Sequence, residues 1–328
     1  MKEHNYQGTI NFFSNEPHIF LPTAFKTIDK EFYQKFINHN IYLIAKTNRI
    51  WFHPAGIKLD KRKNNSYCQF VIQDKYDRIV HPIISKVPKE TDTIEVSKFP
   101  HREMYLKNKH GDIIGSINAL EFLMTLPENT KPDFEILYVG KSYGRKKKIN
   151  IIDRLFKQQH KKFREILIDT IEDSPDKQVV ILALNFAFEK KIISNEFKNL
   201  AKTTTNEKSH RIKYLKEIDI NRTYKIDLIE EALINYFAPK YNDTLKESLS
   251  KLSSKAIKAF QKLGLSSVVV EFNTKSTGIK LKSNYVSPKK LHVIQFSTSQ
   301  NELKTNFFDL KNIKESRQLN NDKLLDLI

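Results

Sequence analysis

The sequence predicts an α+β chain, on three observations. The 328 residues are 39% hydrophobic and 11% aromatic, enough apolar surface for two or three folded cores. Short β-branched and aromatic runs separated by turn clusters occupy residues 1–115, which is typical of β-strands. Further along, apolar runs alternate with stretches of helical periodicity. We therefore predict a β-rich N-terminal domain at 1–115, a mixed domain at 116–245 and a basic C-terminal extension at 246–328.

The same patterns place the individual elements. The first domain should hold a helix at 25–38 and strands at 41–45, 49–52, 68–73 and 79–85. A proline-containing break precedes the mixed domain, which should hold strands at 135–139 and 178–188 and helices at 151–167 and 226–237. For the extension we expect a helix at 246–263 and strands at 267–272 and 291–296.

Composition excludes several classes of protein. No stretch contains the roughly 18 apolar residues that a membrane-spanning helix requires, and residues 1–10 lack the apolar segment of a secretory signal. We therefore expect a cytoplasmic protein with no membrane partner. The one cysteine, Cys68, allows neither an internal disulfide nor a multi-thiolate zinc site.

The net charge of +18 indicates a polyanionic partner because of where the charge lies. Lysine outnumbers arginine 46 to 10, which an A/T-rich genome also produces. Residues 141–164, however, hold ten basic side chains against one acid, and residues 250–328 hold fourteen against six. We predict nucleic acid, double-stranded DNA first, with solvated helix faces as the alternative. The candidate contacts are Lys146, Lys147, Lys148, Lys157, Lys161 and Asn242.

Three pieces of sequence carry the chemistry. Residues 137–142 (LYVGKS) read as a strand ending in a glycine turn, which brings the Tyr138 hydroxyl near Lys141. Arg154 lies in the helix that follows. Residues 230–242 (EEALINYFAPKYN) then place the Glu230 carboxylate beside an apolar helix face that ends at a proline.

Together these pieces resemble the GIY-YIG nuclease superfamily, and in particular the N-terminal domain of its excision-repair endonucleases. The resemblance covers residues 135–243, and it is shared with long bacterial proteins that carry such a domain. It implies a small antiparallel sheet flanked by helices. The residues that match are Tyr138, Val139 and Gly140 as the second half-motif, Arg154 as the catalytic arginine, Glu230 as the metal-binding glutamate, and Leu233, Ile234, Pro239 and Asn242 at the family's offsets from it.

The resemblance implies phosphodiester hydrolysis with one bound Mg²⁺ or Mn²⁺. Mg²⁺ keeps several waters and needs only one or two carboxylates, which suits Glu230. Arg154 would hold the phosphate oxygens with its planar, permanently charged fork. Tyr138 would position or deprotonate water, the latter only if Lys141 and Arg154 stabilise its phenolate.

Several assignments have structural alternatives. His160 is a second candidate for the catalytic base, but it lies at helical spacing with Phe156 and Phe163 and could instead pack against them. Lys141 could simply extend along the surface beside the turn. Asn242 could contact nucleic acid or, as we favour, fix the turn after Pro239.

The family's first half-motif, Gly-Ile/Val-Tyr, is not found at its usual place. Its tyrosine normally lies about eleven residues before the second one, where this chain has Pro127. Either residues 103–106 (EMYL) form the partner strand and bring Tyr105 into the site, or residues 119–124 form it without a tyrosine.

The sequence therefore favours a metal-dependent DNA endonuclease. The alternative is a non-catalytic nucleic-acid-binding protein on a decayed nuclease domain, which the missing tyrosine favours. In a third hypothesis, residues 1–115 bind another protein and recruit the nuclease to it.

Overall fold

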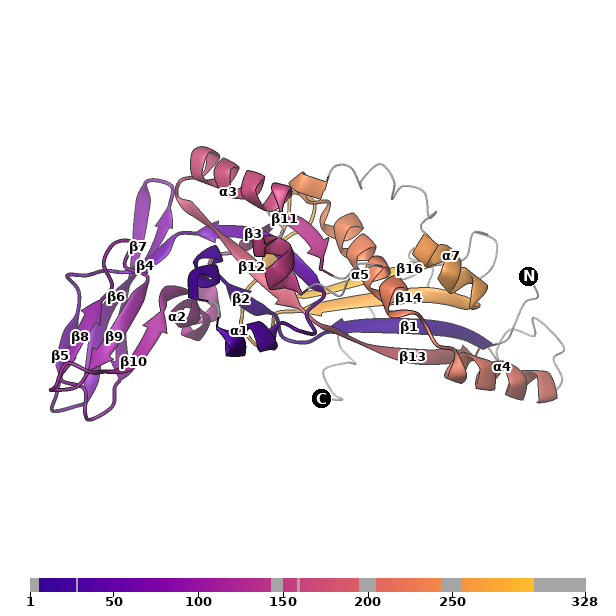
Figure 1. Cartoon of the computed structure of the whole chain (residues 1–328), viewed down its shortest axis with the longest axis horizontal. Helices are drawn as coiled ribbons and strands as arrows, with labels where there is room; N and C mark the ends of the chain where they lie inside the picture. The colour runs from indigo at the N-terminus through magenta and orange to yellow at the C-terminus, as the bar shows by residue number, and fades with distance from the viewer. Residues whose placement is uncertain are drawn as a thin grey trace.

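The computed structural model describes residues 6–27, 29–142, 150–157, 160–194, 205–242 and 255–297. Over these ranges the chain is mixed α/β, and its strand pairs are antiparallel except for β1–β14 and β11–β15. This agrees with the predicted α+β class. The sheets follow one another along an elongated molecule (Figure 1).

A five-stranded sheet in the order β15-β11-β3-β12-β2 forms the middle of the molecule. Its strands are β2 (His18–Phe20), β3 (Ile41–Asn48), β11 (Phe134–Lys141), β12 (Lys177–Leu184) and β15 (Leu281–Lys282). One face packs against the 3-10 turn Pro22–Thr27, α1 (Lys30–Lys35) and α3 (Lys161–Asp173), and α5 (Arg222–Phe237) covers the other. Because both faces are covered, β3 and β12 are buried over most of their length, and each contains an unbroken apolar run, Ile41–Ala45 and Val179–Leu184.

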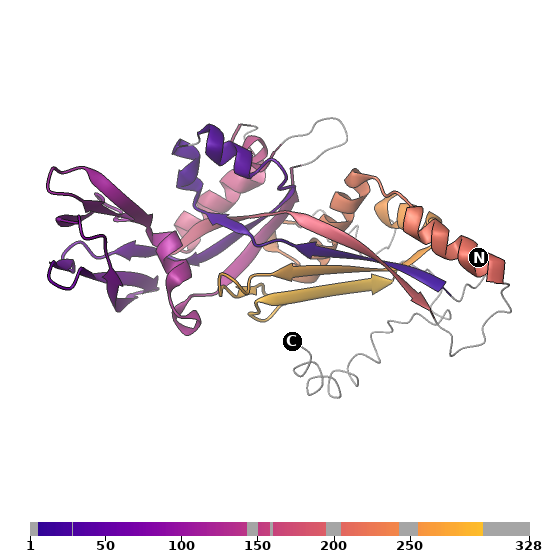
Figure 2. The ribbon, with the colours of Figure 1, turned by 90° about the horizontal axis from the view of Figure 1, so that it is seen from below.

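A second sheet has the order β13-β1-β14-β16. Its strands are β1 (Tyr6–Ser14), β13 (Phe186–Ser194), β14 (Leu265–Asn273) and β16 (Leu291–Ser297). The helices α4 (Thr205–Glu217), α5 and α7 (Lys255–Lys262) lie on one side of it (Figure 2). Alternate residues such as Ile10 and Phe12 are buried, which gives the strands a period of two. Helix α5 contacts strands of both sheets and joins them.

A β-rich insertion lies between β3 and β11 in the sequence. It contains β4 (Ile50–Phe52), β5 (Lys58–Asp60), β6 (Asn65–Asp74), β7 (Asp77–Lys86), β8 (Thr93–Val96), β9 (Glu103–Lys107), β10 (Ile113–Asn118) and α2 (Ala119–Thr125). The ring of Phe122 on α2 packs 5.3 Å from Phe52 and 5.2 Å from Phe70. This contact gives the insertion an aromatic core between its sheet and its helix.

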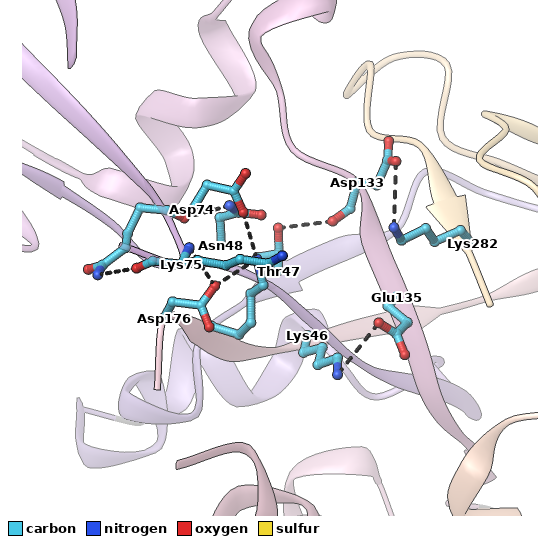
Figure 3. A network of polar contacts seen from close by, with 11 residues as sticks. Lys46, Thr47, Asn48, Asp74, Lys75, Asp133, Glu135, Asp176 and Lys282 are labelled. Atoms are coloured by element: carbon cyan, nitrogen blue, oxygen red, sulfur yellow. Dashed lines mark hydrogen bonds and ion pairs between the residues drawn. The ribbon is translucent and has the colours of Figure 1, made fainter. Parts of the chain in front are cut away.

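Polar contacts at the end of β3 tie the insertion to the central sheet (Figure 3). Lys177 on β12 pairs with Asp74 at 3.3 Å, and the backbone N–H of Lys75 donates to Asp176 at 3.0 Å. The Asn48 amide donates to the backbone oxygen of Gln73 at 2.5 Å. A cavity of about 360 Å³ opens beside this network, at the opposite end of β3 from Tyr42.

The sheets do not follow the predicted division of the chain at residues 115 and 245. β1, β2 and β3 all come from 1–115, yet β2 and β3 pair within the same sheet as β11 and β12. Within 246–328, β14 and β16 belong to the second sheet and β15 edges the central one. The β-rich insertion begins at β4 and not at the start of the chain.

Three predicted elements are each divided in the structure. The helix expected at 25–38 is the 3-10 turn Pro22–Thr27 followed by the short helix α1. The helix expected at 151–167 is a π-helical turn, Asp153–Lys157, followed by α3 from Lys161. The strand expected at 178–188 is β12 and β13, which belong to different sheets. At the junction, the backbone oxygen of Asn185 accepts from Asn15 at 2.9 Å. Between Val179 and Phe188 the apolar run is interrupted only at Asn185, so the sequence pattern does not mark the change of sheet.

Candidate active site

Two tyrosines lie next to each other on the paired strands β3 and β11. In the antiparallel register Tyr42 is opposite Gly140, and Tyr138 lies diagonally across from it. The centroids of the two tyrosine rings are 6.1 Å apart. Tyr42 is 1% exposed, whereas Tyr138 is half-buried. Tyr138 is therefore the member of the pair that reaches the surface.

Gly140 is required for this pairing. A Cβ atom at residue 140 would lie 2.5 Å from Cζ of Tyr42 and 2.6 Å from Cε1 of Tyr138. Both distances are shorter than any real Cβ contact, and the obstructing atoms belong to packed rings. The glycine of the Tyr-Val-Gly sequence thus makes room for the two rings.

Neither strand expected to pair with β11 does so. Residues 103–107 form β9, which pairs with β8 and β10, and residues 119–125 form helix α2. The Tyr105 hydroxyl donates to Glu103 within the insertion. The antiparallel partner of β11 is β3, which brings Tyr42 next to Tyr138. Sequence analysis missed Tyr42 because the β-rich insertion separates β3 from β11 in the chain.

The Tyr42 hydroxyl is at the centre of a hydrogen-bond network. The backbone N–H of Phe163 donates to Nδ1 of His160 at 3.1 Å, so the neutral imidazole carries its proton on Nε2. Nε2 lies 3.0 Å from the Tyr42 oxygen and donates to it. Arg154 also interacts with the Tyr42 hydroxyl and lowers its pKa, and Tyr42 in turn lowers the pKa of Tyr138. The network links both tyrosines to Arg154 and to the start of α3.

His160 is a positioning residue in this arrangement. Burial, and then the charge of Arg154, lower its pKa to about 4, so the ring is neutral near pH 7. Both ring nitrogens are engaged, one by the first turn of α3 and the other by Tyr42. The residue that was a candidate base therefore acts here as a helix cap and a hydrogen-bond donor.

Both phenols hold their protons near neutral pH. Burial raises the pKa of Tyr42 well above 10. Burial, and then the Glu230 carboxylate, also raise the pKa of Tyr138, although Arg154 and Lys141 oppose this. Arg154 and Lys141 thus stabilise a Tyr138 phenolate as expected, but burial and Glu230 destabilise it by more. Tyr138 is better suited to orienting a water molecule than to deprotonating it.

Arg154 reaches the tyrosines from the π-helical turn Asp153–Lys157. The Asn150 side chain starts this turn by accepting from the backbone N–H of Ile152 at 2.6 Å and of Asp153 at 3.2 Å. Ile152 is fully buried and anchors the turn to the sheet. A widened turn re-aims its side chains, and such turns are frequent at functional sites. Here the turn directs Arg154 to the Tyr42 hydroxyl.

Glu230 on α5 forms an ion pair with Lys141 at the end of β11. Lys141 also contacts Asp227 at 2.9 Å, one helical turn before Glu230. The side chain of Glu230 is 11% exposed and that of Asp227 is 18% exposed. Burial raises the pKa of Glu230, and the Lys141 ammonium opposes this rise. Burial alone would lower the pKa of Lys141, but the two carboxylates raise it. Asp227 was missed by sequence analysis, although its spacing of three from Glu230 was a visible signal.

Asn242 has a structural role. Its side-chain oxygen accepts from the backbone N–H of Val139, and its amide nitrogen donates to the Val139 oxygen, both at 2.9 Å. It is 2% exposed. The residue therefore clamps the chain after α5 to β11 and fixes Glu230 relative to Tyr138, and both ends of its amide are bonded to Val139.

The predicted phosphate-binding lysines are described only in part. Lys157 pairs with Asp153 at 2.7 Å and remains 65% exposed, and Lys161 is exposed at the start of α3. Lys146, Lys147 and Lys148 lie outside the described residues. Among the described residues, no group of three or more His, Cys, Asp or Glu side chains could hold a metal ion. The carboxylates available at the tyrosine cluster are Glu230 and Asp227.

No family model, curated protein or solved structure matches this chain. Among the described helices, none is both long enough and apolar enough to span a membrane. The function therefore has to be inferred from the site itself.

Proposed function

We propose that this protein is a divalent-metal-dependent endonuclease that hydrolyses phosphodiester bonds in DNA on a GIY-YIG-like core. The observation that carries the proposal is the meeting of Tyr42, Tyr138, Arg154 and Glu230 from four separate elements. A phenol pair, a guanidinium and a carboxylate around one point suit a phosphate, a metal and a water. These side chains are far apart in sequence, so their meeting is a property of the fold.

Tyr42 supports the proposal because the superfamily resemblance calls for two tyrosines on adjacent antiparallel strands. Residues 40–42 (Asn-Ile-Tyr) stand where the first half-motif would lie, and Tyr42 is the register partner of Gly140. On this interpretation the β-rich insertion follows the first strand, so the two half-motifs are far apart in the sequence but adjacent in the sheet. The objection raised by the missing tyrosine then falls away.

The carboxylates fit a metal of the expected kind. Mg²⁺ binds through one or two carboxylates and keeps several waters, and the Lys141 ammonium already stands as a cation at Glu230. When bound, Mg²⁺ or Mn²⁺ would stabilise negative charge on the leaving oxygen. Arg154 would neutralise charge on the phosphate, while the Tyr138 hydroxyl would orient the attacking water.

One observation favours the alternative, a non-catalytic nucleic-acid-binding protein. Lys141 neutralises the carboxylate that a metal would need, as expected of a site that has lost its metal. The exposed basic side chains around Lys157 and Lys161 would serve either function. A test must therefore measure cleavage and binding together.

The test is incubation of purified protein with supercoiled plasmid in Mg²⁺, Mn²⁺ or EDTA. We expect metal-dependent cleavage that EDTA and Glu230→Gln abolish, with DNA affinity kept or raised because a negative charge is lost. Glu231→Gln is the matched control, since the neighbouring residue lies a further 100° round the helix, and it should cleave normally. Absence of cleavage by the wild type in every metal, with binding intact, would transfer the assignment to the non-catalytic function.

A further inference from the structure

Lys141, Asp227 and Glu230 form a group of one cation and two anions beside the tyrosine pair. The ammonium contacts both carboxylates, and its side chain is 32% exposed. Asp227 and Glu230 are three residues apart on α5, so they share one face of the helix. Lys141 is fixed at the end of β11 and pairs in register with Ile41. Two rigid elements therefore hold the three charges together.

The two carboxylates are already compensated when no metal is bound. Two carboxylates and one ammonium carry −1, and the Arg154 guanidinium at the same cluster brings the sum to zero. Partly buried charges are costly unless they are compensated. A divalent metal that binds Glu230 would therefore compete with a cation that is already in place.

We propose that Lys141 is a resident counter-ion that a divalent metal must displace from Glu230, and that Asp227 retains the displaced ammonium. The inference rests on the proposed function in taking Glu230 as the metal ligand. It goes beyond it by giving Asp227 a role that no motif assigns. Lys141 then protects the buried carboxylate while metal is absent and stays close to the phosphate when metal is present.

Two other arrangements would use the same residues differently. Asp227 could itself ligate the metal, in which case Lys141 would have no part in its effect. Alternatively, the ion pair could be purely structural, in which case neither residue would affect metal affinity selectively. A double-mutant cycle separates these cases because it measures the coupling between the two side chains.

The experiment is titration of Mn²⁺ alone, without DNA, into the full chain by calorimetry and by the electron paramagnetic resonance signal of free Mn²⁺. Lys141→Met should bind Mn²⁺ at least tenfold more tightly than wild type, because the competing cation is gone. Asp227→Asn should bind several-fold more weakly, since Lys141 then has only Glu230 as a partner. In the double variant Lys141→Met/Asp227→Asn, the change in the logarithm of Mn²⁺ affinity caused by Asp227→Asn should be less than half of the change that it causes in the wild type.

Lys46→Met is the matched control. Lys46 forms an ion pair with Glu135 at 3.6 Å in the same sheet, and its side chain is 25% exposed. This variant also removes one positive charge, but from a lysine that pairs with Glu135 and not with Glu230. Its Mn²⁺ affinity should therefore stay within twofold of wild type. Thermal unfolding checks that each variant is folded, and Lys141→Gln replaces Lys141→Met if the methionine variant does not fold.

Unchanged or weaker Mn²⁺ binding in the Lys141 variant would overturn the inference while leaving Glu230 as a ligand, provided that Glu230→Gln abolishes binding. A full-sized Asp227→Asn effect in the double variant would also overturn it, and would make Asp227 a ligand. Failure of the wild type and of Lys141→Met to bind Mn²⁺ would remove the metal site itself, and the nuclease proposal with it.

Discussion

Nε2 of His160 lies 3.0 Å from the Tyr42 hydroxyl, and Nδ1 of the same ring accepts from the first turn of α3. One imidazole thus performs two tasks at opposite edges of its ring. The first task orients the buried tyrosine, and the second starts the helix. The two tasks can be separated by substitution, because asparagine and glutamine each reproduce one edge of a histidine.

His160→Gln should retain more DNA cleavage than His160→Asn. Glutamine places an N–H near the position of Nε2 and can still donate to Tyr42, whereas asparagine places its oxygen near Nδ1 and can still cap α3. We expect roughly a tenfold loss of cleavage rate for asparagine and a smaller loss for glutamine, because a less well oriented Tyr42 positions its neighbours less accurately. Stability should follow the opposite order, with glutamine losing about 1 kcal/mol of cap energy in urea unfolding. If the two variants rank in the same order for cleavage rate and for stability, the tautomer assigned to His160 is wrong.

The part of this site that β11 and α5 provide could be predicted from the sequence, whereas the contribution of Tyr42 could not. Tyr138, Gly140 and Glu230 lie in local patterns, a strand that ends in a glycine and a helix that ends at a proline, so their elements were predicted correctly. The strand of Tyr42 was predicted too, but its pairing with β11 is a long-range contact that local periodicity does not encode. Asp227 differs, because its helical spacing from Glu230 was readable but no motif drew attention to it.

Gly140→Ala should destabilise the protein and displace both tyrosines. The added methyl would lie 2.5 Å from Cζ of Tyr42, and overpacking a tight core costs about 1–3 kcal/mol. Urea unfolding measures the cost, and cleavage should fall with it. Gly115→Ala on β10 is the control, because its Cβ would lie 3.4 Å from Leu106 and should change stability by less than about 0.5 kcal/mol. A fully stable Gly140→Ala would show that the rings are not packed as described.

Tyr42→Phe should lose most cleavage activity, as should Tyr138→Phe. Removing the Tyr42 hydroxyl breaks the link from His160 and Arg154 to Tyr138, so we expect losses of about a hundredfold in cleavage rate. Plasmid cleavage rates at saturating metal provide the measurement. Tyr105→Phe is the control, since Tyr105 lies in β9 and bonds to Glu103. Normal cleavage by Tyr42→Phe would exclude Tyr42 from the site.

DNA affinity should fall linearly with salt on a double-logarithmic plot, with a slope near −0.9 per neutralised phosphate. Replacing Lys146, Lys147 and Lys148 together by alanine should flatten the slope by up to about three units. The matched control is the exposed basic triplet Lys61–Lys63 in the insertion, whose replacement should leave the slope unchanged. If the two triple variants behave alike, residues 146–148 are not part of the binding surface.

Acid should destabilise the protein through its buried histidines. Burial lowers the pKa of His39, His160 and His292 from 6.5 to about 4. The unfolded chain therefore takes up protons at a higher pH than the folded chain does. The stability that these neutral rings contribute is complete above pH 6.5, falls as the pH drops towards 4 and then levels off, by up to about 1.4 kcal/mol per pH unit for each ring.

His292→Gln tests this on β16 of the second sheet, at a residue outside the tyrosine cluster. His292 is fully buried; its Nε2 donates to the Lys289 backbone oxygen at 3.0 Å, and its Nδ1 accepts from Tyr236 at 3.2 Å. Glutamine keeps a donor but does not titrate, so the free energy of unfolding should fall less steeply between pH 6.5 and 4.5 than in wild type. Urea unfolding at several pH values gives the two slopes, and exposed His110→Gln should follow the wild-type profile. Parallel profiles for His292→Gln and wild type would mean that the pKa of this ring is the same in the folded and unfolded chains, and that its burial does not carry the acid sensitivity.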